Sequence, residues 1–436
     1  MKAAFYTLGC KVNQTETEAL AGIFRAGGYD IVPFEERADV YVINTCTVTN
    51  MGDRKSRQVI RRAGKANPEG TVVVMGCYAQ VAPEEVSRIP GVDLVVGTRD
   101  RGRILELVEK ARDGAEPVNM VREAWQGAVF EELPLLETES RVRATLKIQE
   151  GCNQFCTYCI IPYARGPVRS RDPEKAMEEA ARLMAAGYKE IVLTGIHTGA
   201  YGLDLGLDLN YLVSRLAGLP GLKRLRLSSV ESTEFTPGLI GTIAANPVVC
   251  PHLHIPLQSG SDRILARMNR PYSRREFERI VKELRGKIPD LAITTDIIVG
   301  FPGEDEADHR DSLEFAAQME FANIHVFKYS PRTGTPAAGY TPQVAPGEKE
   351  ARSREFINLA RRGWQDYASR YLGRSMEVLV EQDVAQNQWE GHTATYLRVR
   401  FPAKGDLRGE LVRARLEDLA DDFVRGQLEI ISSLKG

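Results

Sequence analysis

Several features that would place a chain of 436 residues in a special class are missing from this one. No run of 18 or more apolar residues occurs, so the sequence predicts no membrane span. The formal net charge is only −2, which excludes a uniformly basic nucleic-acid binder and leaves local basic patches for that purpose. Internal repeats and low-complexity tracts are absent too. What remains is typical of a globular protein of about two to four domains.

The first ten residues do not make a convincing signal segment. Met1–Cys10 ends in Leu-Gly-Cys, as a lipoprotein signal does, but one lysine and a short mixed stretch are too little for a charged and a hydrophobic region. We therefore expect Ala3–Leu8 to be a first strand and the protein to be cytoplasmic.

Cysteine is scarce, with seven residues, and their clustering in a large chain favours metal or redox chemistry over disulfides. Three of them form Cys152-Asn-Gln-Phe-Cys156-Thr-Tyr-Cys159, with no fourth cysteine nearby. Three thiolates can hold three irons of a cubane cluster and leave the fourth iron open to a substrate or cofactor. Zinc usually takes four protein ligands, so a zinc-stabilised RNA-binding protein without enzymatic activity is the less favoured alternative.

The first block, residues 1–115, alternates strands with helices, a pattern that predicts a parallel sheet with helical crossovers. Strands are predicted at 3–8, 40–44, 71–75 and 92–96, and helices at 16–26, 54–66 and 103–112.

Cys10, Cys46 and Cys77 each follow one of these strands. The loops at the carboxyl ends of parallel strands line the binding crevice of an open α/β sheet, so we expect the three thiols to meet there. The residues leave open whether they hold zinc, hold an iron cluster or are buried structural cysteines. For the seventh cysteine, Cys250, we favour a buried structural thiol.

Residues 116–138 predict a linker, and 139–372 form a second alternating block. Its strands are predicted at 144–149, 190–194, 222–227, 252–256, 292–299 and 324–329, with helices such as 173–186, 277–285, 306–319 and 348–371. Six such repeats predict a partial β/α barrel, and the cysteine motif follows the first strand, where barrel active sites are built. The last block, 373–436, has short β segments at 376–380, 395–400 and 410–415, which predict a small β-barrel of a kind that binds nucleic acid.

These motifs together resemble the radical S-adenosylmethionine (SAM) enzymes, and their methylthiotransferase branch in particular. The resemblance rests on the string from Gly151 to Arg171, with Tyr158 before the last cysteine, and on the segments 254–261, 267–270 and 295–304. It covers all three blocks in order. The segment Thr7-Leu-Gly-Cys-Lys-Val-Asn-Gln14 is similar to the subgroup that modifies N6-threonylcarbamoyladenosine beside the tRNA anticodon. The isopentenyladenosine and ribosomal-protein subgroups typically differ just after this cysteine.

The resemblance implies an α/β fold with a radical SAM barrel, a TRAM-like terminal β-barrel, two 4Fe-4S clusters and SAM. The cluster on Cys152, Cys156 and Cys159 would bind SAM and cleave it to a radical. A second cluster, on Cys10, Cys46 and Cys77, would hold the sulfur that is methylated and transferred. Implied partners are the tRNA anticodon stem-loop and a reductant such as flavodoxin or ferredoxin. A ribosomal protein side chain, or isopentenyladenosine in tRNA, is the alternative substrate.

Five further residues are predicted SAM contacts: Tyr158, Gly195, Glu231, Gln258 and Asp296. Gly195 ends the second barrel strand, where it would admit the ligand's amino group, although an ordinary βα turn would also explain it. Glu231 suits a ribose hydroxyl or is a surface carboxylate. Gln258 and Asp296 are weaker candidates, because polar residues near strand ends often only brace loops.

Other polar residues have more than one interpretation. Arg165 and Arg169 would support a SAM carboxylate or an RNA phosphate, or are solvated loop residues. The proposed chemistry needs no histidine base, so His197, His252 and His254 are expected to pack or to line the site.

Predicted RNA contacts depend on local charge. One helix presents a basic side that either binds phosphates or is merely solvated, formed by Arg54, Arg57, Arg61, Arg62 and Lys65. Residues 374–436 carry nine Lys and Arg against eleven Asp and Glu, a balance that fits a protein substrate as well. Alternate residues share a strand face, so a basic strip could still form there from Arg398, Arg400, Arg413 and Arg415.

Overall fold

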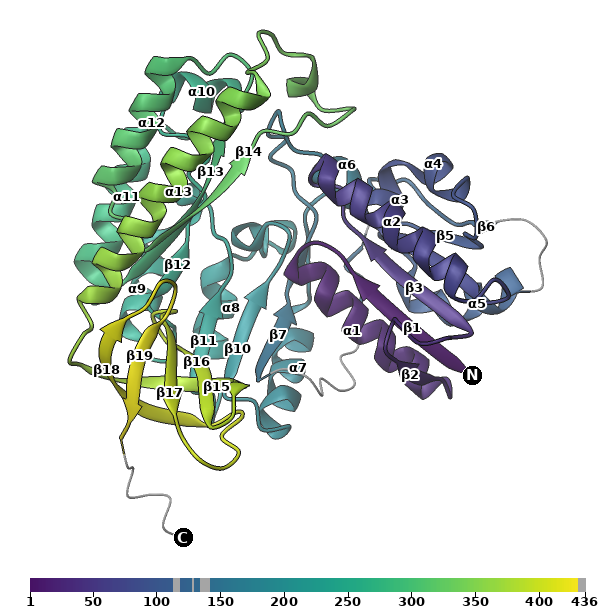
Figure 1. Ribbon diagram of the computed structural model, residues 1–436, viewed down its shortest axis with the longest axis horizontal. Coiled ribbons are helices and arrows are strands. Elements are labelled where there is room, and N and C mark those ends of the chain that lie inside the picture. The colour runs from purple at the N-terminus through teal and green to yellow at the C-terminus, as the bar shows by residue number, and fades with distance from the viewer. Residues whose placement is uncertain (113–117, 128, 134–141, 430–436) are drawn as a thin grey trace.

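The computed structural model describes residues 1–112, 118–127, 129–133 and 142–429, which form three blocks in chain order (Figure 1). The predicted linker, 116–138, lies partly outside these residues. Within the described residues, no helix combines the length and apolarity that crossing a bilayer requires.

The first block is a six-stranded parallel sheet of order β2-β1-β3-β4-β5-β6. The strands are β1 (Lys2–Thr7), β2 (Asp30–Val32), β3 (Val40–Thr45), β4 (Thr71–Gly76), β5 (Leu94–Val96) and β6 (Val118–Asn119). The helices are α1 (Lys11–Ala26), α2 (Asn50–Ala66), α3 (Cys77–Val81), α4 (Pro83–Ser87) and α5 (Ile104–Arg112). Every residue of β3 and β4 is buried, because α1 and α5 pack on one face of the sheet and α2 on the other.

The predicted strands and helices of this block are confirmed, within a few residues at their ends. The sequence reading missed β2, β6, α3 and α4, which have two to five residues each. Elements this short depend on their sheet neighbours rather than on their own pattern. Strand β6 pairs with β5, so the sheet continues past residue 115 into the predicted linker.

The central block has six parallel strands in two sheets, β7-β10-β11 and β12-β13-β14, joined by bridges from Leu225 to Val249 and from Ser229 to His254. The strands are β7 (Arg143–Lys147), β10 (Glu190–Thr194), β11 (Arg224–Leu227), β12 (His252–His254), β13 (Ala292–Val299) and β14 (Asn323–Lys328). The helices are α7 (Pro173–Ala185), α8 (Leu209–Ala217), α9 (Pro237–Ala245), α10 (Asp262–Arg267), α11 (Arg274–Lys287), α12 (Glu306–Gln318) and α13 (Pro346–Ser369). The predicted partial six-fold barrel is confirmed.

After β7, a short two-stranded sheet brings together the two ends of the loop that carries the cysteine motif. Strand β8 (Gln149–Glu150) pairs antiparallel with β9 (Arg169–Ser170), and the loop between them carries the motif and helix α6 (Ile161–Arg165). Gly151 has φ +75°, and a Cβ there would lie 1.8 Å from the Pro167 carbonyl oxygen. Only glycine fits this crossing of the two chain segments.

The last block is a closed barrel of order β15-β16-β17-β19-β18. Its strands are β15 (Ser375–Ala385), β16 (Gln388–Thr393), β17 (Arg398–Pro402), β18 (Leu411–Leu419) and β19 (Val424–Leu428). The barrel packs beside the ends of β10 and β11, where Arg226 donates to the Ala394 carbonyl at 3.0 Å (Figure 1).

One predicted strand of this barrel is displaced by a few residues, and one prediction is wrong. The strand expected at 395–400 begins only at Arg398, because the chain turns at Tyr396 with φ +67°. The four arginines do not make one strip, because β19 separates β17 from β18. Arg398, Arg400 and Arg413 are paired with acidic residues instead.

Candidate functional site

Cys10, Cys46 and Cys77 lie at the carboxyl ends of β1, β3 and β4, three neighbouring strands of the sheet. The strand ends are level, since Thr7 pairs with Asn44 and Thr45 with Gly76. The thiols are close enough to influence one another: burial, together with repulsion from Cys10 and Cys46, outweighs the nearby Arg165 guanidinium and raises the pKa of Cys77 to about 12. Three thiols that repel one another when ionised are a donor set that a metal cluster can hold as thiolates.

Two glycines let the cysteine loops approach. A Cβ on Gly9 would lie 2.9 Å from the Cys46 sulfur, and a Cβ on Gly76 would lie 2.4 Å from Asn44 Oδ1. Both glycines also have positive φ, +100° and +92°. A larger residue at position 9 would clash with Cys46, and one at position 76 would clash with Asn44 and Thr45 at the end of β3.

Arg165, the last residue of α6, connects this triad to the central block. Its Nε donates to the Cys77 sulfur at 3.2 Å, and its Nη1 donates to Glu16 and Glu150 at 2.6 Å each. The side chain is completely buried. The interpretations of Arg165 as a SAM contact, an RNA contact or a solvated residue are therefore wrong, because its donors are already used. Arg169 is buried as well and is no solvated loop residue.

The second triad, Cys152, Cys156 and Cys159, lies in the loop between β8 and α6. Burial, together with repulsion from Cys156 and Cys152, raises the pKa of Cys159 to about 12. The backbone N–H of Cys159 donates to the Cys156 carbonyl at 2.9 Å, which folds the loop back on itself. Three converging thiols without a fourth fit a cluster with one open iron.

Two further side chains contact these sulfurs: Arg270, which had no predicted role, and His197, which was expected to pack or to line the site. Arg270 Nη1 donates to the Cys156 sulfur at 3.3 Å, and His197 Nδ1 lies 3.5 Å from the Cys152 sulfur. His197 also contacts Glu234 at 2.5 Å. Burial lowers the pKa of His197, but Cys152 and Glu234 outweigh burial and raise it to about 10. Arg270 was inside a motif quoted from the sequence, yet its target lies 114 residues away.

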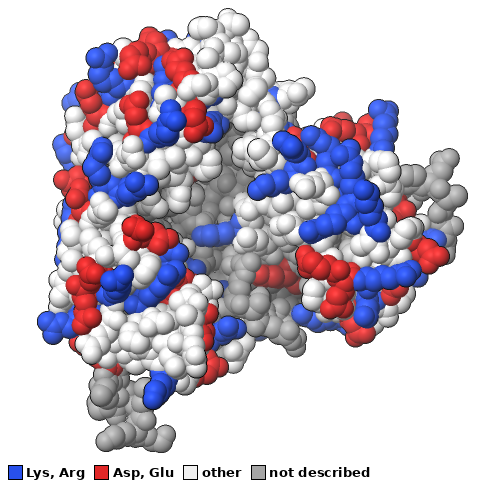
Figure 2. Space-filling model, in the orientation of Figure 1, with Lys and Arg blue, Asp and Glu red and all other residues white. Residues whose placement is uncertain are grey.

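One cysteine of each triad lines a cavity, and the two cavities adjoin. A cavity of about 200 Å³ is lined by Cys159 together with the predicted SAM contacts Tyr158, Gln258 and Asp296. A larger one, of about 1150 Å³, is lined by Gly9, Cys10, Gly195 and Asp296 among others. The two share Val48, Ile161, Asp296 and Phe327 as lining residues. The larger opens as the hollow between the first block and the rest of the molecule (Figure 2).

The predicted SAM contacts Gln258 and Glu231 lie in different environments. Gln258 has φ +66°, a conformation that costs a non-glycine residue energy and is often found at functional sites. Glu231 lines neither cavity, and its carboxylate is paired with Arg270. Glu231 therefore contacts the cysteine motif only indirectly, because Arg270 lies between its carboxylate and the Cys156 sulfur.

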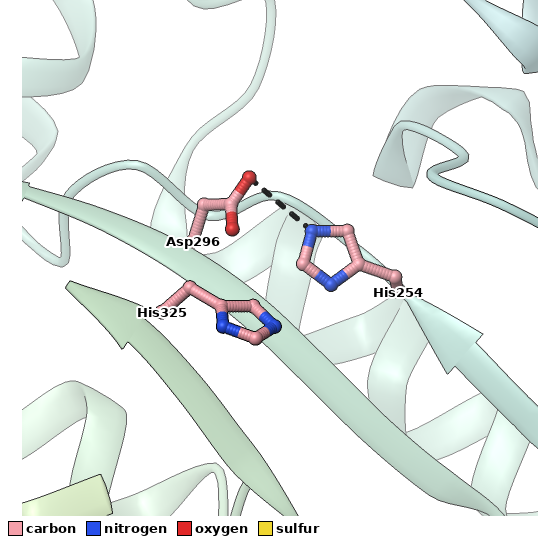
Figure 3. Close-up of side chains that lie close together, drawn as sticks. All are labelled: His254, Asp296 and His325. Atoms are coloured by element: carbon pink, nitrogen blue, oxygen red, sulfur yellow. Dashed lines mark ion pairs between the residues drawn. The ribbon is translucent and has the colours of Figure 1, made fainter. Parts of the chain in front are cut away.

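His254, Asp296 and His325 come from the neighbouring strands β12, β13 and β14 and point toward one another (Figure 3). Their nearest donor atoms lie within 4.8 Å, a set that a divalent transition metal accepts. Hydrogen bonding already satisfies His254 without a metal, because its ring contacts Asp296 at 3.2 Å and Thr294 at 2.9 Å. As expected, His252 and His254 line the larger cavity.

The basic side of α2 lies on the surface, where Figure 2 shows Lys and Arg gathered. Arg57 is engaged by Glu85 and Tyr78, and Arg62 lies over the Phe34 ring. Arg54, Arg61 and Lys65 are exposed and form no ion pair with any residue that the structure describes. They remain available to an anionic partner.

Comparisons with known proteins agree with this organisation. Residues 2–97 match the family described as "Uncharacterized protein family UPF0004", and residues 146–316 match the radical SAM superfamily. The chain is 46% identical to the threonylcarbamoyladenosine tRNA methylthiotransferase MtaB of Bacillus subtilis (strain 168), over 97% of this chain and 95% of that one. It is 37% identical to the tRNA-2-methylthio-N(6)-dimethylallyladenosine synthase of Moorella thermoacetica, over 97% of each. The radical SAM methyltransferase TsrM of Kitasatospora setae shares the fold, with a TM-score of 0.59 at 15% identity over 77% of each chain.

Proposed function

Because this chain belongs to the radical SAM methylthiotransferase family, we propose that it places a methylthio group on C2 of N6-threonylcarbamoyladenosine beside the anticodon of tRNA. The observation that carries the proposal is the pair of cysteine triads on adjoining cavities, combined with 46% identity to a protein named for this reaction. The dimethylallyladenosine synthases are more distant, at 37% identity or less. A ribosomal protein substrate is not favoured.

The residues around each triad suit a 4Fe-4S cluster with one open iron. Each triad offers three thiols, and each has an arginine that donates to a sulfur, Arg270 in one case and Arg165 in the other. Hydrogen bonds to cluster sulfurs stabilise the reduced state, because they withdraw negative charge. In our proposal Cys152, Cys156 and Cys159 hold the SAM-cleaving cluster, and Cys10, Cys46 and Cys77 hold a second one.

When bound, SAM and the clusters supply the methyl group, the radical and the inserted sulfur. The protein's part is positioning. Tyr158, Gln258 and Asp296 form the wall of the cavity that would hold SAM beside Cys159. Gly195 lines the larger, adjoining cavity, and any side chain there would clash with Gln149, since a Cβ would lie 2.9 Å from its Oε1. Glu231 would act through Arg270 on the Cys156 sulfur, with a ribose contact left to its second oxygen.

The substrate would enter through the larger cavity. It lies between the Cys10 loop, the ends of the central strands and the terminal barrel, and its volume of about 1150 Å³ accommodates a modified nucleoside. The exposed face of α2 would hold the phosphates of the anticodon stem. We further propose a cytoplasmic location and a small electron-transfer protein, such as flavodoxin or ferredoxin, as reductant.

The direct test uses the reconstituted enzyme with SAM, a chemical reductant and an anticodon stem-loop that carries threonylcarbamoyladenosine. Nucleoside mass spectrometry should detect the 2-methylthio derivative. Matched stem-loops with unmodified adenosine and with dimethylallyladenosine serve as controls. Modification of only the dimethylallyl stem-loop would contradict the proposed substrate, and anaerobic analysis that finds zinc without sulfide would contradict the proposed chemistry.

A further inference from the structure

The larger cavity contains one basic side chain whose charge is not balanced, Lys11. It is the first residue of α1, directly after Cys10, and its side chain reaches solvent, although burial among the cavity residues lowers the pKa of its ammonium group more than the nearby Tyr396 raises it. Among the described residues, its ammonium group takes part in no ion pair or hydrogen bond. The first turn of α1 contains no acidic residue that would neutralise it.

The other charged groups that line this cavity are paired. Arg226 contacts Glu190 at 2.7 Å, and Arg398 contacts Asp422 at 2.5 Å. Among the acids, Glu390 is paired with Arg400 and Glu381 with Arg143, while Asp296 contacts His254, which balances its charge only when that ring is protonated. Lys11 is therefore the one basic side chain among the described residues of this cavity that has no acidic partner.

Groups that can donate hydrogen bonds surround Lys11. Its charge acts on Tyr396 and on His325, both of which line the same cavity. Burial and the nearby His254 lower the pKa of His325, so its ring is neutral at pH 7 and carries one N–H. An ammonium, an imidazole and a phenol around one space favour an anion that accepts several hydrogen bonds.

We propose that Lys11 binds the carboxylate of the substituent on the substrate adenosine and thereby selects a threonylcarbamoyl group over an uncharged one. The inference rests on the proposed function. A threonylcarbamoyl substituent ends in a carboxylate that is ionised at neutral pH, whereas a dimethylallyl substituent is a hydrocarbon. A site with an unpaired ammonium discriminates strongly, because an uncharged occupant would leave that charge desolvated and without a partner.

The position of Lys11 beside Cys10 fits the reaction. The urea N–H of a threonylcarbamoyl substituent can donate to N1 of the same base, which turns the threonine toward the C2 edge. The carboxylate and C2 then lie on the same side of the base. Binding the carboxylate at Lys11 would bring C2 toward the triad that starts at Cys10. Lys11 is thus a specificity-determining and positioning residue, and Tyr396 and His325 would complete the contact.

The test compares stem-loops that carry threonylcarbamoyladenosine as the free acid and as its methyl ester, which removes the charge and keeps the shape. For the wild-type enzyme we expect kcat/KM to fall about 10- to 100-fold on the ester, mostly through KM, the range for losing a charge-assisted hydrogen bond. Lys11→Met should lose a similar factor on the acid and treat acid and ester alike. Lys11→Arg should restore part of the preference for the acid. Lys175→Met, which removes an exposed lysine on α7, should behave as wild type.

The same experiment distinguishes a contact of Lys11 with the substrate carboxylate from a contact with an RNA phosphate. If Lys11 contacts an RNA phosphate instead, Lys11→Met will weaken the acid, the ester and an unmodified stem-loop equally, and the inference is wrong. It is also wrong if the wild-type enzyme uses acid and ester within about twofold of each other, a difference too small for a charge contact. This last comparison does not depend on any variant. If the enzyme modifies neither threonylcarbamoyl stem-loop, the proposed function fails together with the inference.

Discussion

At the residue scale, the sulfur atoms of both triads receive hydrogen bonds from buried cations. Arg165 donates to Cys77 and Arg270 to Cys156. Each arginine is in turn held by a carboxylate, Glu16 for the first and Glu231 for the second. Such outer contacts fix the orientation of a ligand and tune the reduction potential of the group it holds. The two triads share this arrangement although they come from different folds.

Cysteine substitutions should separate the roles of the two triads. Cys156→Ala should abolish SAM cleavage, because the proposed SAM-binding cluster loses one of three ligands. Cys46→Ala should retain SAM cleavage and stop sulfur insertion. Deoxyadenosine release and nucleoside mass spectrometry measure the two steps on the same sample.

Cys250→Ala is the matched control for these substitutions. Cys250 is a buried thiol outside both triads, so this variant should keep both activities and the full iron content. Loss of cleavage in Cys46→Ala, with the protein folded, would argue against two separate roles.

At the element scale, α1, α6 and β8 are connected by a buried network of charges. Glu16 of α1 contacts Arg101, Lys147 and Arg165, and Glu150 of β8 contacts the same three cations. Removing one partner from such a network leaves buried charges without compensation.

Arg165→Met should therefore lower the free energy of unfolding by about 3–5 kcal/mol, the range for breaking a buried ion pair. Urea unfolding followed by circular dichroism measures the change. Arg370→Met is the control, since the pair of Arg370 with Glu320 is exposed and worth about 0–1 kcal/mol. Equal losses in the two variants would show that the network adds no more than a surface pair.

The exposed basic face of α2 gives a second prediction at this scale. Replacing Arg54, Arg61 and Lys65 by Gln should raise KM for the stem-loop and flatten its dependence on salt, because fewer counterions are released on binding. SAM cleavage without RNA should not change. A triple change on α11, at Arg275, Arg279 and Lys282, controls for net charge. If both triple variants raise KM alike, α2 is not the phosphate-binding face.

At the scale of the whole molecule, the network also fixes the first block against the central one, so its titration affects the stability of the assembly. Burial raises the pKa of Glu16, but Arg101, Arg165 and Lys147 outweigh burial and hold the pKa at about 2, against an ordinary value of 4.5. A carboxylate with a lowered pKa in the folded state stabilises the fold above pH 4.5. That stabilisation is lost as the pH falls from 4.5 toward 2.

We expect protonation of Glu16 to lower the free energy of unfolding of the cluster-free protein by about 3 kcal/mol as the pH falls from 4.5 to 2. Glu16→Gln should be less stable at pH 7 and should lose less on acidification. Glu109→Gln, on the exposed side of α5, should keep the wild-type slope. Identical slopes in wild type and Glu16→Gln would contradict this assignment.

The order of the elements and both cysteine triads could be read from the sequence, because hydrophobic periodicity and motif spacing are local properties. All six strands of the central block were predicted, and two of them have the predicted bounds, Glu190–Thr194 and Ala292–Val299. The alternation of strands and helices implies a parallel sheet. Its strands end at the same edge, which places Cys10, Cys46 and Cys77 at the same level.

The tertiary structure alone decided which distant side chains meet. Arg165 and Glu16 are 149 residues apart, and Arg270 and Cys156 are 114 apart, so no local pattern connects them. A SAM contact, an RNA contact and a solvated loop residue were all open for Arg165, because a single charged residue does not reveal its burial. Lys11 was quoted only as part of a motif. Its unpaired charge becomes visible once the folded chain places every other charged group of the cavity beside a partner. Pairing and burial depend on the whole fold, whereas a sequence records only the order of the residues.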